Sequence, residues 1–290
     1  MQLPLVVGVD GSQSSLRATD WAVDQAARHN LALRLVYAFR WENYEGSALA
    51  DSLGRPSEQA TAQRIVISAA ERARHRNPEV TVSAKAVSED PVTALLHEAE
   101  TASALVTGSH GRGAVAGLLL GSVSLAVAAR AHCPVIVVRG GETAVAGRHE
   151  RILLGVGDDA DVEAVRFAFR EAQARHCTID AVRAWRRPAY EGADHPLLVS
   201  ESGHAHEAQA SDVLDQALTG LTREYPQVPV RRATVEGPAR NVLLQRAAAA
   251  DLVIVGARRH PGHLGLQLGR VAHTLLHRAP CPVAIVPQPS

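Results

Sequence analysis

The sequence predicts an α/β protein made of two similar domains, each a parallel β-sheet covered by helices. Short apolar runs, of the length of buried strands, alternate with longer segments whose apolar residues recur at helical spacing. Landmarks of the first half return in the second: Cys133-Pro134 reappears as Cys281-Pro282, and Gly8-Val9 as Gly155-Val156. A length of 290 residues accommodates two domains of ordinary size. We expect these domains at residues 1–140 and 150–290.

The composition restricts the class of protein. Hydrophobic residues make up 46% of the chain but aromatic residues only 3%, so the cores must be built from Val, Leu, Ile and Ala. Thirty basic and thirty acidic residues cancel, which gives no electrostatic reason to expect nucleic acid or an anionic membrane as partner. Three scattered cysteines indicate a reducing compartment and not a disulfide framework. With neither a signal-peptide pattern nor an apolar run of about 20 residues, we expect a cytoplasmic protein.

The first half begins with an apolar run at 3–9, which reads as a buried strand ending in a polar turn. Ser12 or Ser14 then caps a helix whose apolar stripe includes Leu16 and Val23. A second strand is expected at 31–39, and the polar, glycine-bearing segment that follows is a loop. The next helix begins at Ser57, where apolar residues recur at a spacing of four.

The remaining elements of the first half follow the same alternation. Further strands are expected at 80–87, 104–107 and 135–138, and further helices at 91–101 and 123–130. Residues 140–150 read as a glycine-rich linker. The long polar segments 42–56 and 188–211 are either lids over the two crevices or disordered loops. The carboxyl ends of parallel strands share one edge of the sheet, so Asp10 and Gly108 should lie near each other.

A glycine-rich stretch runs from Gly108 to Gly113 and continues to Gly121-Ser122-Val123-Ser124, between a predicted strand and a predicted helix. Glycines let a backbone approach an anion, and loop N–H groups and a helix N-terminus supply donors, so this arrangement suits a phosphate. Ser122 can donate its hydroxyl and cap the helix. The alternative is a turn that simply connects strand to helix. Neither the Walker A pattern nor the dinucleotide fingerprint is present.

The spacing Gly108-x2-Gly111-x9-Gly121-Ser122 resembles the nucleotide motif of the universal stress protein family. Val9-Asp10-Gly11-Ser12 resembles the start of the same family's domains, and the resemblance extends over both halves. It implies Rossmann-like sheets in strand order 3-2-1-4-5, similar to the adenine nucleotide alpha hydrolases. It also implies pairing of the two domains through their fifth strands, at 135–138 and 283–286. A homodimer and a regulatory protein partner are further expectations.

The resemblance implies an ATP site between the first and fourth strands of the first half. There Asp10 receives the ribose or adenine end, Gly8 and Ala38 back the adenine, and the glycine-rich stretch wraps the phosphates, with or without Mg²⁺. His110 and Arg112 either contact phosphate or its metal, or point to water. The binding residues expected on this basis are Gly8, Asp10, Ala38, Gly108, Ser109, His110, Gly111, Arg112, Gly113, Ala114, Gly121, Ser122, Val123 and Ser124.

The second half departs from this motif. Arg259 stands at the position of the second motif glycine, Gly269-Arg270 replaces Gly-Ser, and Gly157 takes the place of Asp10, with Asp158 and Asp159 displaced. We expect this site to bind ATP weakly or not at all. The alternative is an anion site in which Arg259 and Arg270 pair with phosphate.

Histidines and cysteines outside the motif are interpreted as structural. His273 and His277 have a helical spacing that can hold a metal, but no matching carboxylate or cysteine accompanies them, so we expect them to face solvent. His204 and His206 are expected in a polar loop. The three cysteines are expected to pack as small hydrophobic side chains.

The sequence therefore predicts an ATP-binding regulator of the stress response, with the nucleotide in the first domain. Residues that would form a catalytic base, an arginine finger or a Walker acid are not recognisable, so hydrolysis should be weak at most. The alternatives are a slow ATPase or phosphotransferase that uses the same cleft, and a protein-interaction scaffold without nucleotide.

Overall fold

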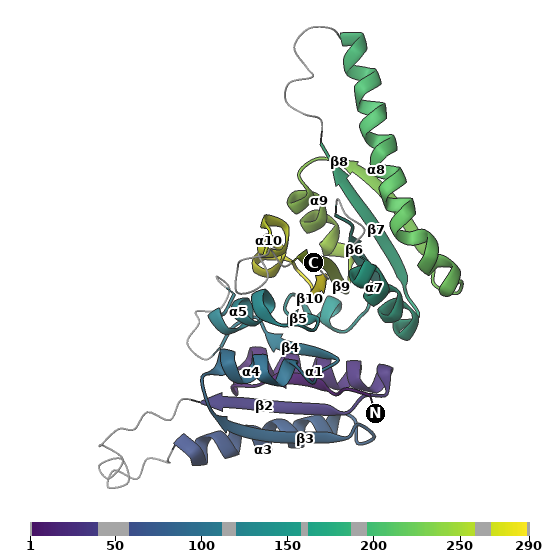
Figure 1. Ribbon diagram of the computed structural model, residues 1–290. Helices are drawn as coiled ribbons and strands as arrows, with labels where there is room; N and C mark the ends of the chain where they lie inside the picture. The colour runs from purple at the N-terminus through teal and green to yellow at the C-terminus, as the bar shows by residue number, and fades with distance from the viewer. Residues whose placement is uncertain are drawn as a thin grey trace. The chain divides into compact units, whose positions relative to one another are not determined.

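The computed structural model describes residues 2–39, 58–111, 120–157, 162–186, 196–258 and 268–288 (Figure 1). The chain separates into two compact units, Met1–Arg139 and Gly140–Ser290. Each unit is an α/β domain with five parallel strands, as the alternation in the sequence predicts.

The sheet of the first unit has the order β3-β2-β1-β4-β5, and every neighbouring pair is parallel. This confirms the predicted order 3-2-1-4-5. The central strands are fully buried because helices cover both faces; Val6, Val7, Leu105 and Val106 each have 0% of their surface exposed. The strands are β1 (Leu5–Gly8), β2 (Leu33–Phe39), β3 (Val82–Ser88), β4 (Ala104–Gly108) and β5 (Val135–Val138).

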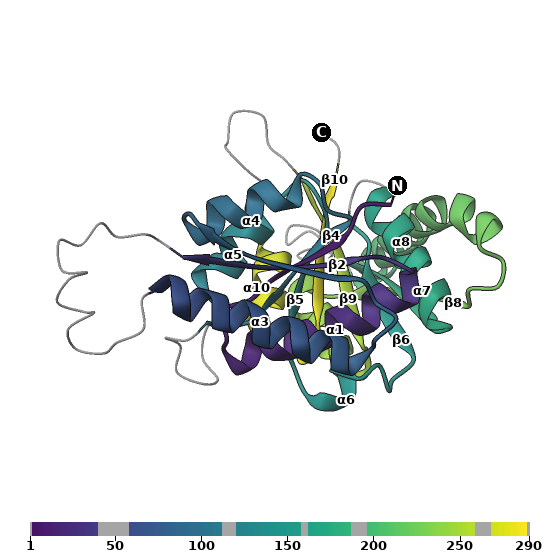
Figure 2. The ribbon, with the colours of Figure 1, turned by 90° about the horizontal axis from the view of Figure 1, so that it is seen from below.

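Two pairs of helices cover the two faces of this sheet (Figure 2). Helices α1 (Gln13–His29) and α3 (Glu58–Arg76) pack on one face, and α4 (Pro91–Ala99) and α5 (Ser122–Arg130) on the other. Of the two candidate caps for α1, Ser12 is the one used, since its hydroxyl accepts a hydrogen bond from the Ser15 N–H at 3.2 Å.

The second unit repeats this architecture with the strand order β8-β7-β6-β9-β10. Its strands are β6 (Arg151–Gly155), β7 (Thr178–Trp185), β8 (Val230–Glu236), β9 (Leu252–Arg258) and β10 (Val283–Gln288). Helices α7 (Val162–Arg175) and α8 (Pro196–Glu224) cover one face. The other face carries α9 (Ala239–Arg246), which continues into the short 3₁₀ helix η1 (Ala247–Ala249), and α10 (Arg270–Arg278).

Two predicted irregular segments are partly helical. The expected linker 140–150 contains the short helix α6 (Glu142–Val145). The expected loop 188–211 is wrong from Pro196 onward, because α8 begins there. His204 and His206 therefore lie on a helix, and the His206 ring stacks on Trp185 with centroids 6.4 Å apart. The segment 42–56 lies outside the described residues, as do 187–195.

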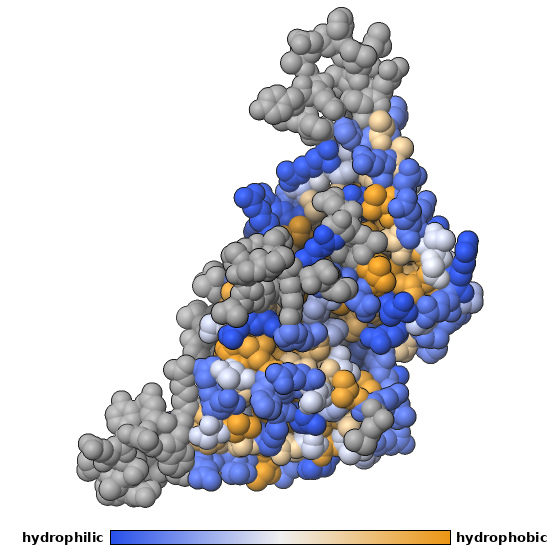
Figure 3. Space-filling model, viewed as in Figure 1, coloured by the Kyte–Doolittle hydropathy of each residue, from blue (hydrophilic) through white to orange (hydrophobic). Residues whose placement is uncertain are grey.

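The three cysteines are buried, as predicted, and burial raises the pKa of the Cys133 thiol to about 11. The exposed large apolar side chains found among the described residues are Leu3, Ile67 and Val162, and on the drawn face hydrophobic residues alternate with hydrophilic ones (Figure 3). Within the same described ranges, every helix is too short or too polar to cross a membrane.

Candidate functional site

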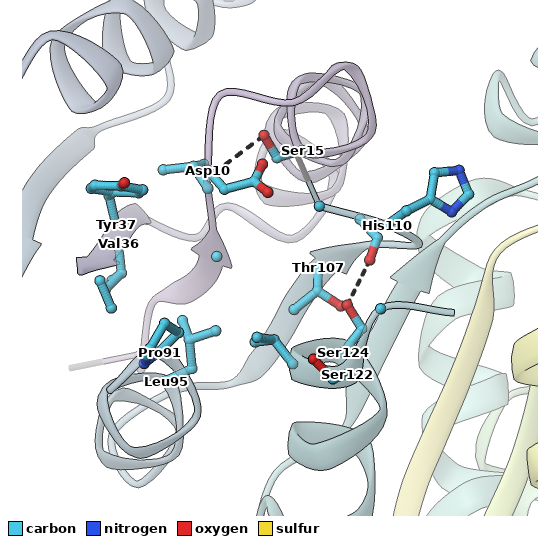
Figure 4. Close-up of a pocket in the computed structure, with 17 residues that line it drawn as sticks. Asp10, Ser15, Val36, Tyr37, Pro91, Leu95, Thr107, His110, Ser122 and Ser124 are labelled. Atoms are coloured by element: carbon cyan, nitrogen blue, oxygen red, sulfur yellow. Dashed lines mark hydrogen bonds between the residues drawn. The ribbon is translucent and has the colours of Figure 1, made fainter. Parts of the chain in front are cut away.

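The carboxyl ends of β1, β2 and β4 and the N-termini of α4 and α5 surround a cavity of about 290 Å³ in the first unit (Figure 4). The strand order reverses between β1 and β4, which is where open parallel sheets form a ligand crevice. The predicted residues that line this cavity are Gly8, Asp10, Ala38, Gly108, His110, Gly111, Gly121, Ser122, Val123 and Ser124.

The other predicted residues are placed differently. Ser109 is buried, and its hydroxyl lies 3.3 Å from the Ser14 hydroxyl and not at the cavity. Arg112, Gly113 and Ala114 lie outside the described residues. The sequence analysis missed further lining residues because most are apolar or small and read as core or helix positions. They are Val9, Ser15, Val36, Tyr37, Pro91, Leu95 and Thr107.

The beginning of the glycine-rich loop is bound to the N-terminus of α1. The Ser14 hydroxyl accepts hydrogen bonds from the N–H groups of Ser109 (2.8 Å) and His110 (3.3 Å), and the Ser12 hydroxyl donates to the His110 carbonyl at 3.3 Å. Of the loop N–H groups expected to serve a phosphate, those of Ser109 and His110 are already engaged by Ser14. Their donors hold the loop in place.

Gly108 is required by packing at this junction. A Cβ atom there would lie 2.7 Å from the Ser14 carbonyl carbon, so only glycine lets β4 end against α1. On the opposite side, the Ser124 hydroxyl donates a buried hydrogen bond of 2.7 Å to the Gly108 carbonyl. Ser124 thereby ties the first turn of α5 to the end of β4.

The N-terminus of α5 presents free donors to the cavity. The helix begins at Ser122 and its N-cap is Gly121, which has no side chain, so the prediction that Ser122 caps the helix is wrong. The N–H groups of Ser122, Val123 and Ser124 find no acceptor among the residues that the structure describes. These three donors and the positive end of the helix dipole form a ready binding site for an anionic group.

Asp10 lies at the edge of the cavity, at the end of β1. Its Oδ1 accepts a hydrogen bond from the Ser12 N–H at 2.9 Å, and its own N–H donates to the Ser15 hydroxyl at 3.3 Å. Its Oδ2 lies 2.9 Å from the position that a Cβ of Gly111 would occupy, so Gly111 makes room for this carboxylate. Asp10 is the acidic residue, and His110 the basic one, of the described lining, which includes no Lys or Arg.

The corresponding region of the second unit is arranged differently. Gly157 follows β6 where Asp10 follows β1, and its carbonyl accepts a hydrogen bond from the guanidinium of the buried Arg183. Strand β9 continues through Arg258, which pairs with Gln288 on β10. A Cβ on Gly155 would lie 2.8 Å from Leu243, so the end of β6 is tightly packed against α9. Arg259, Asp158 and Asp159 lie outside the described residues.

His273 and His277 both lie on α10, with ring centroids 4.4 Å apart. His273 is exposed and His277 is half-buried, so the expectation that both face solvent holds for the first and only partly for the second. A group of three or more potential metal-binding side chains does not occur within the described ranges of the chain.

A sequence model of the universal stress protein family matches residues 1–139 and again residues 149–287. The chain belongs to this family. A universal stress protein of Mycobacterium tuberculosis (strain ATCC 25618 / H37Rv) is 34% identical to it over 291 residues, covering 98% of this chain and 97% of the relative. A universal stress protein of Mycobacterium bovis has the same identity and coverage.

Solved structures support the fold. The crystal structure of a universal stress protein from Archaeoglobus fulgidus DSM 4304 covers all of this chain and of its own, with a TM-score of 0.71 and 15% identity. The crystal structure of a universal stress protein in complex with cAMP matches 48% of this chain at 33% identity, with a TM-score of 0.36. Because the family model matches each half of the chain, the two units are tandem universal stress protein domains.

Proposed function

We propose that the first universal stress protein domain binds ATP in its crevice and that the protein acts as a nucleotide-dependent regulator in a stress response. The observation that carries the proposal is the cavity at the strand ends, where most of the predicted motif residues meet the uncapped N-terminus of α5. A stable nucleotide complex needs both features, because the base requires an enclosed, largely apolar space and the phosphates require donors.

The family resemblance assigns the nucleotide's orientation within this proposal. Gly8 and Ala38 back the adenine, and Asp10 offers Oδ2, which accepts no hydrogen bond from a described residue, to the ribose hydroxyls. The phosphates lie toward Ser122, Val123 and Ser124. Because the described lining has no Lys or Arg, Mg²⁺ would supply much of the positive charge that ATP needs.

Slow turnover is part of the proposal. Asp10 is the one carboxylate of the described lining; its Oδ1 is engaged by the Ser12 N–H, and in this proposal its Oδ2 is taken by the ribose, so it is not placed to activate water at the phosphates. A protein that holds ATP without consuming it suits a regulator whose partner contacts depend on occupancy. We propose that the partner is a regulatory protein and that the two domains pair through their fifth strands. We also propose that the protein is cytoplasmic.

The first experiment is to purify the chain without added nucleotide, denature it, and identify released nucleotides by chromatography. We expect ATP at a stoichiometry near one per chain. Mostly ADP would favour the ATPase alternative. If no nucleotide is released and none binds on titration, the proposal is wrong. A turnover assay with Mg²⁺ completes the test, since a rate of about 1 s⁻¹ or more would exclude a holding protein.

A matched pair of variants tests the site. Asp10→Ala should weaken ATP binding about tenfold or more, because it removes a charged acceptor for the ribose. Asp212→Ala, at an exposed position on α8 in the second domain, is the control and should leave the affinity unchanged. Equal affinities for the two variants would show that the nucleotide does not contact Asp10.

A further inference from the structure

The second domain contains a pocket of about 350 Å³ to which three arginines contribute. Arg186 follows β7, Arg240 lies in the first turn of α9, and Arg270 is the first residue of α10. We call this the arginine pocket. The rest of its described lining is small or apolar, and no acidic residue belongs to it.

Two helix N-termini meet at the arginine pocket. The N-cap of α9 is Pro238 and that of α10 is Gly269, and neither makes a side-chain capping bond. Within the part of the chain that the structure describes, the N–H groups of Arg240 and Arg270 have no acceptor. Both helix dipoles therefore place partial positive charge beside the three guanidinium groups.

The first domain neutralises the equivalent helix end with a carboxylate. Asp90 caps α4 by accepting from the N–H groups of Val92 (3.1 Å) and Thr93 (3.2 Å). Pro238 holds this place before α9, so the capping charge is missing from the second domain. The difference leaves the pocket with donors and positive charge that no described residue satisfies.

The guanidinium groups also have no counter-charge among the described residues. Arg186, Arg240 and Arg270 are exposed and form no ion pair with any described residue. Like charges around one cavity repel each other, and a bound anion offsets this repulsion by its attraction to each guanidinium group. Guanidinium groups and helix N-termini both favour phosphate, because they offer several donors to one anion.

The arginine pocket corresponds to only part of the ATP crevice of the first domain, since both include the end of the second strand and the N-termini of the two helices on that face. It is lined by the end of β7 and the two helix N-termini, and the end of β6 does not contribute to it. A ligand of this pocket therefore stays near the helix ends, with its charge between the arginines.

We propose that the second domain binds a small anion that carries two or more phosphate groups in the arginine pocket. The phosphates contact Arg240, Arg270 and the two helix N-termini. This site uses none of the residues assigned to ATP in the first domain, so either proposal can fail without the other.

The test is calorimetric titration of the full chain with pyrophosphate, comparing the wild type with Arg240→Ala/Arg270→Ala. We expect saturable binding by the wild type and at least tenfold weaker binding by the double variant. Arg223→Ala, at an exposed position on α8 away from the pocket, is the control and should bind like the wild type. ATP binding by the first domain should be unchanged in the double variant, which shows that the protein remains folded.

Two further arms identify the source of the phosphates. In the first arm, ATP is titrated into Asp10→Ala and into the same variant with Arg240→Ala/Arg270→Ala added. If the added substitutions abolish ATP binding, the ligand is a nucleotide. If ATP does not bind to Asp10→Ala but pyrophosphate binds and is lost with the added substitutions, the ligand is a free polyphosphate. The proposal is overturned if pyrophosphate fails to saturate the wild type at about 1 mM, or if the double variant binds it as tightly.

Discussion

Strand β4 of the first domain ends at Gly108, whereas β9 of the second domain continues as a strand through Arg258. Ser109 and His110 leave the sheet because the Ser14 hydroxyl takes their N–H groups, while Ala257 and Arg258 stay paired with Pro287 and Gln288. The same sheet order can therefore support two different strand ends. The difference shows that the shape of the crevice depends on which group accepts the backbone hydrogen bonds after the fourth strand, and not on the sheet alone.

A second comparison concerns one ion pair. In the first domain Arg34 on β2 contacts Glu98 on α4 at 2.9 Å; in the second, Asp180 on β7 contacts Arg246 on α9 at 2.9 Å. Both pairs join the second strand to the helix that covers it, with the charges reversed. Lys85 adds a third charge beside Glu98, at 2.5 Å, in the first domain. The shared architecture requires opposite charges at this point but not a particular polarity.

Reversing the charge at Glu98 should produce the largest loss of stability. Glu98→Arg places a third positive charge beside Arg34 and Lys85 in a side-chain site that is only 8% exposed. The free energy of unfolding should fall by about 3 kcal/mol, measured by urea denaturation. Arg34→Asp/Glu98→Arg, which copies the polarity of the second domain, should recover part of this loss. If the double variant is no more stable than Glu98→Arg, the two pairs are not equivalent.

Two glycine substitutions should separate packing from ligand binding. Gly108→Ala should lower the free energy of unfolding by about 2 kcal/mol, because its Cβ would meet the Ser14 backbone at 2.7 Å. Gly121→Ala should cost about 1 kcal/mol or less, since its Cβ has no contact closer than 3.6 Å, yet it should weaken ATP binding severalfold. Thermal melts and ATP titrations measure the two effects. Unchanged ATP affinity in Gly121→Ala would place the phosphates elsewhere.

Ser124→Ala tests the link between α5 and the end of β4. The second domain has Ala272 at the corresponding position, so the substitution copies a residue that this fold accepts. Loss of the 2.7 Å hydrogen bond to the Gly108 carbonyl should lower the free energy of unfolding by about 1 kcal/mol. Ser122→Ala, which loses no hydrogen bond among the described residues, is the control in the same denaturation assay. Equal stabilities would mean that the Ser124 bond contributes nothing.

The smallest expected effect is a pH dependence from Glu98. Burial raises the pKa of this carboxyl, but the hydrogen bonds from Lys85 and Arg34 outweigh it, so the pKa in the folded state lies below its usual 4.5. A lowered folded-state pKa contributes stability that is complete above pH 4.5 and is lost as the pH falls through the folded-state value. Glu98→Gln should remove this acid-dependent part, under about 1 kcal/mol. An unchanged slope of stability between pH 5 and about pH 3 would contradict the assignment.

The elements that the sequence predicts best are those dictated by apolar runs. The run Val135–Val138 is a strand with the predicted bounds, and the strand order 3-2-1-4-5 follows from the family resemblance. The beginning of α8 was not predicted because its large apolar residues, at 197–199, stand together and do not recur at helical spacing before Ala210, Leu214 and Leu218. A segment whose apolar residues do not recur at helical spacing gives no periodic signal.

The site was predictable to the level of the motif but not of its hydrogen bonds. Glycine spacing identified the loop, yet the sequence could not show that Ser14, distant in the chain, accepts from Ser109 and His110. The assignment of the cap to Ser122 failed because a cap is defined by backbone angles, and Gly121 has the extended ones. The arginine pocket was invisible for a related reason, since only the fold brings Arg186, Arg240 and Arg270 together.

The central claim is that the first domain holds ATP at its strand ends and that the second domain's corresponding crevice does not. Calorimetric titration of the nucleotide-free chain with ATP and Mg²⁺, alongside Gly111→Arg, tests it most directly. This variant copies Arg259 and places a long side chain where a Cβ would already lie 2.9 Å from the Asp10 carboxylate. We predict one tight site per wild-type chain and its loss in the variant. Two equivalent tight sites, or one that survives in Gly111→Arg, would contradict the account.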